Sequence, residues 1–310
     1  MHPARAVGAH LQRLVDRSPT PTPDGPAGDV LLAYLHEHFT ALLQEDPRVR
    51  IDAHDAVHRM RVTTRRMRSV LATYRSLLTG EETVRLLRDE LKWLAGVLGR
   101  ARDAEVMHER LRALLADEPV DLLLGPVERR VDIELGGDYK KAHTRVLKTL
   151  DGRRYVRLLD LLGSLLENPE LTPRSTSPAD QVIPKLIKRD TERLRRAVLA
   201  AKNHPARIGD HPALHDARKS AKRLRYAAEA ASPIGRNKIS RLAEAAQEIQ
   251  KILGDHQDSV VTRILLRRLG AEAFYQGENG FSFGRLHALE QCAAVDAETR
   301  FHREWKHFPG

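Results

Sequence analysis

Apolar residues recur every three or four positions along almost the whole chain, which is the period of one face of an α-helix. Clear stripes of leucine and isoleucine fall in residues 86–98, 158–166 and 249–269. No segment alternates strictly between apolar and polar residues, as a half-buried strand would. The sequence therefore predicts an all-α fold of about ten helices between Asp29 and the C-terminus, several of them long.

Glycine, proline and short polar clusters mark the expected ends of these helices. Breaks are predicted at Thr79-Gly80, Gly136-Gly137, Gly152, 168–178, 204–212, 232–235 and 277–280. Asp29, Asp52 and Asp210 stand where a side chain would cap a helix N-terminus.

Two proline-rich segments interrupt the helical pattern. Residues 18–28 predict an extended linker after a short N-terminal segment, and residues 168–178 predict a hinge. The expected organisation is an N-terminal segment and linker (1–28) followed by one helical domain (29–308). Its two halves, about 29–167 and 179–308, are similar in length, so an internal duplication is worth testing.

The two halves share a basic motif. Residues 56–71 read AVHRMRVTTRRMRSVL and residues 213–228 read ALHDARKSAKRLRYAA, which gives HxxRxxx[RK]RxR in both. A weaker match follows, because residues 98–103 (LGRARD) align with residues 253–258 (LGDHQD). We therefore expect a compact helical bundle with two-fold pseudo-symmetry. Gln257 in place of Arg102, Lys222 in place of Arg65, and Tyr226 in place of Ser69 distinguish the halves.

Helical geometry places most of each motif on one face. Within an arc of about 80° and a length of about 15 Å lie His58, Arg61, Arg65 and Arg68 in the first half and His215, Arg218, Lys222 and Arg225 in the second. Like charges three or four residues apart repel each other on a helix. No Asp or Glu occurs between Arg59 and Gly80, so the first row calls for an anion from elsewhere.

Composition agrees with a basic, folded binding protein. Lys and Arg number 52 against 42 Asp and Glu, and 40 of the 52 are Arg, whose forked guanidinium suits phosphate oxygens. The hydrophobic fraction of 41% excludes a wholly disordered chain. The single cysteine excludes an internal disulfide and a Cys-rich zinc site. With no apolar run of membrane-spanning length, we expect a cytoplasmic protein.

The paired basic motifs, each followed by an LG…D segment, resemble the CHAD domain, the conserved histidine α-helical domain. The resemblance covers about residues 29–308. It implies an all-helical fold of two similar halves whose His and basic residues line a positive surface or cavity that binds inorganic polyphosphate. In this family a CYTH domain often comes before the helical domain, and residues 1–17 resemble the tail of a preceding domain without containing the acidic CYTH motifs.

The sequence thus predicts a non-catalytic polyphosphate-binding module without cofactor or metal, possessing a role in targeting to polyphosphate and an association with polyphosphate granules. The predicted binding residues are His58, Arg61, Arg65, Arg66, Arg68, His215, Arg218, Lys222, Arg223 and Arg225, with Arg145, Arg193 and Arg196 as extensions. The matched Asp103 and Asp258 are expected to cap helices or to pair with an Arg of the site.

Two alternatives stay open. A helical metal-dependent phosphohydrolase would use His54-Asp55, His215-Asp216 and Asp258, although nearby Arg rows would repel a divalent cation. A basic helical protein can also bind nucleic acid weakly and non-specifically. Base stacking needs aromatic side chains, however, and only Tyr74 and Tyr226 lie close to either motif.

Overall fold

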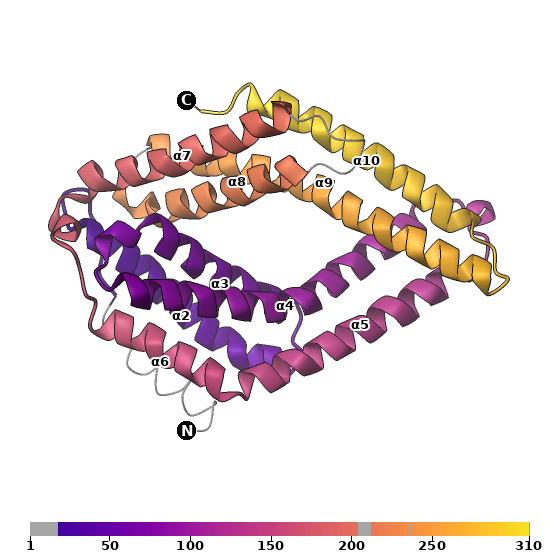
Figure 1. Cartoon of the computed structure of the whole chain (residues 1–310), viewed down its shortest axis with the longest axis horizontal. Helices are drawn as coiled ribbons and strands as arrows, with labels where there is room; N and C mark the ends of the chain where they lie inside the picture. The colour runs from indigo at the N-terminus through magenta and orange to yellow at the C-terminus, as the bar shows by residue number, and fades with distance from the viewer. Residues whose placement is uncertain (1–17, 204–211, 236, 310) are drawn as a thin grey trace. The chain divides into compact units, whose positions relative to one another are not determined.

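The computed structural model describes residues 18–203, 212–235 and 237–309, and this part of the chain is mostly α-helical (Figure 1). The α-helices are α2 (Ala27–Arg50), α3 (Ala56–Thr73), α4 (Glu81–Ala116), α5 (Val127–Leu150), α6 (Arg153–Glu167), α7 (Ala179–Asn203), α8 (Pro212–Ala230), α9 (Asn237–Tyr275) and α10 (Phe281–Trp305). Short 3-10 helices are η1 (Arg75–Leu77), η2 (Val120–Leu122), η3 (Pro173–Thr176) and η4 (Ser232–Ile234). Within these ranges β-pairing is limited to two isolated bridges, so the predicted all-α class is confirmed. No helix in the described ranges is both long and apolar enough to span a membrane.

Several predicted helix ends were wrong. Gly136-Gly137 does not break the chain, because α5 continues through both residues as one helix. Asp29 does not cap a helix, because α2 begins after Pro26 and Asp29 lies in its first turn. There its negative charge interacts favourably with the positive end of the helix dipole. The helix predicted to start after Asp52 begins instead after Asp55, and both aspartates adopt positive φ in the tight connection. The predicted cap at Asp210 lies outside the described residues.

Long-range contacts divide the chain into two compact units. Unit 1 comprises Met1–Arg102, Lys141–Asp190 and Arg223–Ala243, and unit 2 comprises Asp103–Lys140, Thr191–Lys222 and Glu244–Gly310. Each unit therefore takes segments from both halves of the sequence, and α4, α5, α7, α8 and α9 each contribute to both units.

The core of unit 1 is built around α2 and α3, which lie side by side (Figure 1). Phe39 and Leu42 from α2 and Met60 and Met67 from α3 are fully buried. The Tyr74 ring is also fully buried, and its hydroxyl donates to the Ala227 carbonyl over 2.6 Å. These side chains fix the apolar face of α3 inward, so its basic face must point away from this core.

The proline-rich segments of unit 1 are joined to each other. Pro26 and Pro178 form an isolated bridge, and the Ala27 amide donates to the Ser177 carbonyl over 2.9 Å. The Ala179 amide donates to the Gly25 carbonyl over 2.8 Å. Pairing these polar backbone groups holds the start of α2 beside the start of α7.

Unit 2 has its own apolar core, formed where α4, α5, α9 and α10 converge. The buried cluster consists of Met107, Leu111, Leu115, Val127, Val131, Leu135, Leu266, Leu269, Ala273, Phe283 and Leu286. Gly270 allows α10 to approach α9 closely, since a Cβ at this position would lie 3.1 Å from the Phe283 Cβ. This close contact holds two long helices against each other within the unit.

A buried ion pair connects three helices of unit 1. The Arg223 Nε on α8 lies 2.8 Å from Asp190 Oδ1 in the middle of α7, and the Asp190 side chain is 3% exposed. Thr73 donates its hydroxyl to the other Asp190 oxygen, and Arg223 Nη2 donates to the Ala72 carbonyl over 3.0 Å. Arg223 thus stabilises the C-terminal end of α3 as well as neutralising Asp190.

We predict that Asp190→Ala destabilises the protein strongly, by about 3 kcal/mol, because it leaves the half-buried Arg223 without its carboxylate. Urea-induced unfolding followed by circular dichroism measures the change. Glu192→Ala is the matched control, since Glu192 is exposed on the same helix, and it should change stability by less than about 0.5 kcal/mol. Equal effects of the two substitutions would contradict the assignment of Asp190 as the anchor.

Candidate functional site

The basic row of α3 is the outer face of an amphipathic helix. Its inner positions, such as Val57, Met60 and Met67, are buried. Residues of the predicted row lie on the other side, where Arg61 and Arg65 are half-buried and Arg68 is exposed. One face of α3 packs into the core of unit 1, so the cations of the motif lie on the opposite face, at the surface of the unit.

The basic row of α3 (His58, Arg61, Arg65 and Arg68) contacts helix α4 at Gly99. A Cβ added to Gly99 would lie 3.3 Å from the Arg61 Nε, so the guanidinium lies directly against the α4 backbone. Three residues further along α4, Arg102 lies 3.9 Å from Asp55, the residue before α3. Since later residues of α4 meet earlier residues around α3, the two helices run antiparallel in this register.

Helix α4 adds a basic face that sequence reasoning missed. Arg88, Lys92 and Arg102 lie within about 80° of one another and of Gly99 around the helix. Arg88 is close enough to Arg68 for its charge to lower the Arg68 pKa, after the larger effect of desolvation and against the opposing charge of Asp89. We call the combined set the α3/α4 basic seam, which comprises His58, Arg61, Arg65, Arg68, Arg88, Lys92 and Arg102. The signal for the α4 residues is present in the sequence, because Arg88, Lys92 and Arg102 share the helical face of Gly99 in the LG segment.

Unit 2 repeats this local arrangement with α8 and α9. A Cβ on Gly254 would lie 3.3 Å from Arg218 Nη2, which corresponds to the contact of Arg61 with Gly99. His215 Nδ1 lies 2.9 Å from Gln257 Oε1. In the register of the first pair, the residues at these two positions are His58 and Arg102. In each repeat, therefore, the first Arg of the basic row packs against the glycine of the LG segment: Arg61 against Gly99, and Arg218 against Gly254.

At two of the three positions where α4 carries a cation of the seam, α9 carries an amide. Counting from the two glycines, Gln247 and Gln257 occupy the positions of Lys92 and Arg102. We call His215, Arg218 and Lys222 the α8 row. The helix beside the α8 row is therefore less positive than the helix beside the α3 row, although the cations of the two rows occupy corresponding positions.

Burial and charge set the protonation of the α8 row. The pKa of His215 is lowered first by desolvation and then by the charge of Lys219, so the imidazole is neutral near pH 7. An amide oxygen only accepts, so the His215 Nδ1–H donates to Gln257 and Nε2 is left as an acceptor. Arg218 has a buried Nε that has no hydrogen-bond partner among the described residues. Burial also raises the pKa of Asp258, although the charge of Arg218 opposes this effect.

Asp103 and Asp258 do not cap helices, because both lie well inside α4 and α9. That part of the prediction was wrong. For Asp258, the electrostatic effect of Arg218 agrees with the alternative expectation that this carboxyl faces an Arg of the site.

Three predicted binding residues have carboxylate partners within unit 1. Arg225 Nε lies 2.6 Å from Glu229 Oε1, and Arg66 Nη2 lies 3.3 Å from the other Glu229 oxygen. Both guanidinium groups also lie over the Tyr226 ring, Arg66 at 5.5 Å and Arg225 at 5.8 Å from its centre. Arg223 pairs with Asp190, as described above. Within unit 1, Arg66, Arg223 and Arg225 therefore each have a carboxylate that offsets their charge.

The predicted extensions lie elsewhere. Arg193 and Arg196 line an open pocket of about 480 Å³ in unit 2, together with Ala197, Ala200, Ala213 and Asp216. Around α8, Ala213 and Asp216 lie about 100° or more from every member of the α8 row, so this pocket adjoins another face of the helix. Arg145 is exposed on α5 in unit 1.

Comparison with known proteins identifies the family. The model of the CHAD domain matches residues 33–267, which include both basic motifs and both LG segments. The chain belongs to the CHAD domain family. This CHAD domain is similar in fold to that of the plant Ricinus communis, with a TM-score of 0.68 and 23% identity over 93% of this chain and 95% of the other. PptA from Streptomyces chartreusis matches with a TM-score of 0.71 and 24% identity, covering 91% of this chain and 99% of the other.

Two proteins of Mycobacterium tuberculosis, the uncharacterized proteins Rv2226 and MT2285, are each 39% identical over 289 residues. The matches cover 91% of this chain and 54% of each relative, so the chain spans about half the length of the curated relatives it matches.

The residues of the metal-hydrolase alternative have separate partners in this CHAD domain. Asp216 pairs with Lys219 over 3.0 Å while His215 contacts Gln257, and Asp55 lies 3.6 Å from Arg59. Among the residues that the structure describes, no group of three or more His, Cys, Asp or Glu is arranged to hold a metal ion.

The close approach at Gly99 yields a stability prediction. Gly99→Leu must displace the Arg61 guanidinium and should destabilise unit 1 by about 1 kcal/mol through overpacking. Gly96→Leu is the control, because a Cβ at Gly96 meets nothing within 4 Å. It should stabilise α4 by about 0.5–1 kcal/mol through helix propensity. Thermal unfolding measures the stability of both variants. Equal stability of the Gly99→Leu and Gly96→Leu proteins would rule out close packing of Arg61 against Gly99.

Proposed function

We propose that this CHAD domain binds inorganic polyphosphate without catalysing its turnover, through the α3/α4 basic seam of unit 1 and the α8 row of unit 2. The observation that carries the proposal is the repeated helix pair, in which the first Arg of each row lies on a glycine of the next helix. Membership in the CHAD family, which is associated with polyphosphate binding, supports the same ligand.

The chemistry of the seam suits a linear chain of phosphates. Such a chain offers oxygens along its whole length, and guanidinium groups can contact them in a bidentate manner. Cations that follow a rigid helix for about 15 Å can meet successive phosphates without ordering a loop. Part of the affinity should come from the release of counterions, so binding should weaken steeply as salt increases.

Nucleic acid is a poorer fit to the same surface. The two tyrosines near the basic motifs, Tyr74 and Tyr226, are 0% and 4% exposed, so neither ring is available for a base to stack upon. Weak electrostatic attachment to nucleic acid would still be expected of any polycationic surface. The burial of these two rings therefore favours an anion without bases at the basic motifs.

In this proposal His215 becomes charged as the anion binds. The neutral imidazole donates through Nδ1 to Gln257, and an anion near Nε2 would raise the pKa and add a second donor. A bound anion would likewise favour the protonated form of Asp258, whose pKa is already raised by burial. Both groups would then take up protons on binding.

A charge-matched pair of variants tests the site. The combined substitutions Arg61→Ala, Arg65→Ala, Arg218→Ala and Lys222→Ala should reduce polyphosphate affinity by about a hundredfold or more while leaving helicity intact. The control removes the same charges from exposed positions elsewhere, through Arg129→Ala, Arg153→Ala, Arg157→Ala and Lys185→Ala. Titration with long-chain polyphosphate at two salt concentrations measures both proteins.

The control variant should lose only the small effect of its reduced net charge. An affinity loss of the same size in both variants would show that binding is non-specific. Displacement of polyphosphate by duplex DNA at equal phosphate concentration would also contradict the proposed ligand.

The affinity should also depend on pH. Because binding is expected to raise a His215 pKa that is lowered in the free protein, affinity should increase as pH falls from about 8 to about 6. One proton taken up corresponds to about tenfold per pH unit at most. His215→Asn should flatten this profile, and titrations across the pH range will show whether it does. An unchanged profile would exclude His215 as the coupled group.

A further inference from the structure

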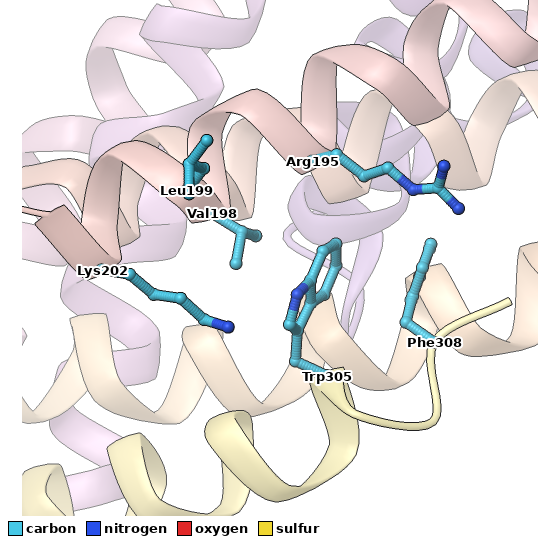
Figure 2. Close-up of a pocket in the computed structure, with 6 residues that line it drawn as sticks. All are labelled: Arg195, Val198, Leu199, Lys202, Trp305 and Phe308. Atoms are coloured by element: carbon cyan, nitrogen blue, oxygen red, sulfur yellow. The ribbon is translucent and has the colours of Figure 1, made fainter. Parts of the chain in front are cut away.

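A second concave site lies in unit 2, at the end of α7. Its volume is about 280 Å³, and it is lined by Arg195, Val198, Leu199, Lys202, Trp305 and Phe308 (Figure 2). Four of these residues come from α7 with spacings of three, four and seven, so they share one helical face. Trp305 and Phe308 approach that face from the end of α10 and the segment after it.

The aromatic side of this site is already ordered. The Trp305 and Phe308 rings are stacked, with centres 4.7 Å apart and planes inclined by 18°. Phe301, which is 0% exposed, lies one turn earlier with its ring centre 6.3 Å from that of Trp305. The Phe308 side of the segment is further held by Arg195, which donates to the Pro309 carbonyl over 3.3 Å. A ligand ring could therefore stack here without first ordering the aromatic side chains.

The α7 side combines apolar surface with positive charge. Leu199 on α7 is 58% exposed, although it is a large apolar residue. Arg195 and Lys202 extend on either side of Trp305 (Figure 2), and the described residues that line the site include no acidic one. An exposed apolar surface next to two lining cations suits a ligand that has both an apolar ring and a negative charge.

This site shares no lining residue with the α3/α4 basic seam or the α8 row. It also differs from the pocket that Arg193 and Arg196 line against α8. Around α7, Arg195, Val198 and Lys202 lie about 100° or more from both of those arginines, and Leu199 lies about 60° from Arg196. The described residues of that pocket include three alanines and no aromatic one, whereas Trp305 and Phe308 line this site. The difference in lining predicts a difference in ligand.

We propose that the α7–Trp305 site binds an anion that carries a planar aromatic ring. The ring packs against Trp305 and Leu199, and the anionic group binds to Lys202 or Arg195. Nucleotides and aryl carboxylates share this chemistry, and the experiment below distinguishes them.

Tryptophan fluorescence provides a local test in the full chain. The protein has two tryptophans, and Trp93→Phe leaves Trp305 as the single reporter. The probes are AMP and 1-naphthoate as aromatic anions, adenosine and naphthylmethanol as their neutral counterparts, and tripolyphosphate as an anion without a ring. Should Trp93→Phe impair folding, the wild-type signal minus that of Trp305→Phe gives the same information.

At least one aromatic anion should change Trp305 emission in a saturable manner. Its neutral counterpart should bind about tenfold or more weakly, because it lacks a charge-assisted hydrogen bond. Lys202→Ala or Arg195→Ala should weaken the anion by a similar factor, whereas Lys306→Ala, which removes a nearby charge outside the site, should not. A response to AMP alone identifies a nucleotide, and a response to naphthoate alone identifies an aryl carboxylate.

The proposal is overturned if neither aromatic anion changes Trp305 emission in the millimolar range. It is also overturned if the neutral counterparts bind equally well, or if tripolyphosphate gives the same response. The quadruple variant of the polyphosphate site should keep its Trp305 response, so failure of either proposal can be recognised separately.

Discussion

The packing of an arginine side chain against a glycine of the neighbouring helix determines the geometry of both basic rows. Arg61 lies against Gly99 and Arg218 lies against Gly254. Any larger residue at either glycine would hold the neighbouring helix or the guanidinium further away. Each contact fixes the register of its antiparallel helix pair, and the register decides which α4 or α9 side chains border the row. The glycine thus sets the position of charges several turns away.

Like charges on one helix face are unfavourable, and unit 1 handles them in two ways. Some cations are paired with buried or half-buried carboxylates, as Arg223 is with Asp190, and Arg66 and Arg225 are with Glu229. Removing one member of such a pair is costly, because the other remains desolvated. The seam gathers cations from two helices, including Arg68 and Arg88, and one of its members, Arg102, lies 3.9 Å from Asp55. In the proposed function, a bound phosphate would relieve the repulsion between these cations.

The two repeats share their register but differ in charge. The seam has Lys92 and Arg102 on the α4 side, whereas α9 has glutamines at the corresponding positions. Gln257 holds the His215 ring in one tautomer, which a cation such as Arg102 could not do by accepting a hydrogen bond. In the proposed function, the α8 row would therefore respond to pH through His215, whereas the guanidinium groups of the seam stay charged throughout.

The helical class, the proline-rich interruptions and the paired motifs could all be predicted from the sequence. Local periodicity is enough for these features, because the 3.6-residue repeat places cations and core residues on opposite faces without reference to other helices. Helix ends were less predictable: Gly136-Gly137 lies within α5, and Asp55 rather than Asp52 precedes α3. Packing along neighbouring helices overrides the modest local preferences of glycine and aspartate.

Tertiary structure alone decided what each cation does. The sequence shows no acidic residue near Arg66, yet folding brings Glu229 to it from a segment more than a hundred residues later. It likewise brings Arg88 beside Arg68, and Trp305 and Phe308 to the end of α7. Whether a charge is neutralised depends on distances between helices, and a one-dimensional pattern contains no such distances. The sequence alone determined the rows, and packing decided which of their cations act as anchors and which border the seam.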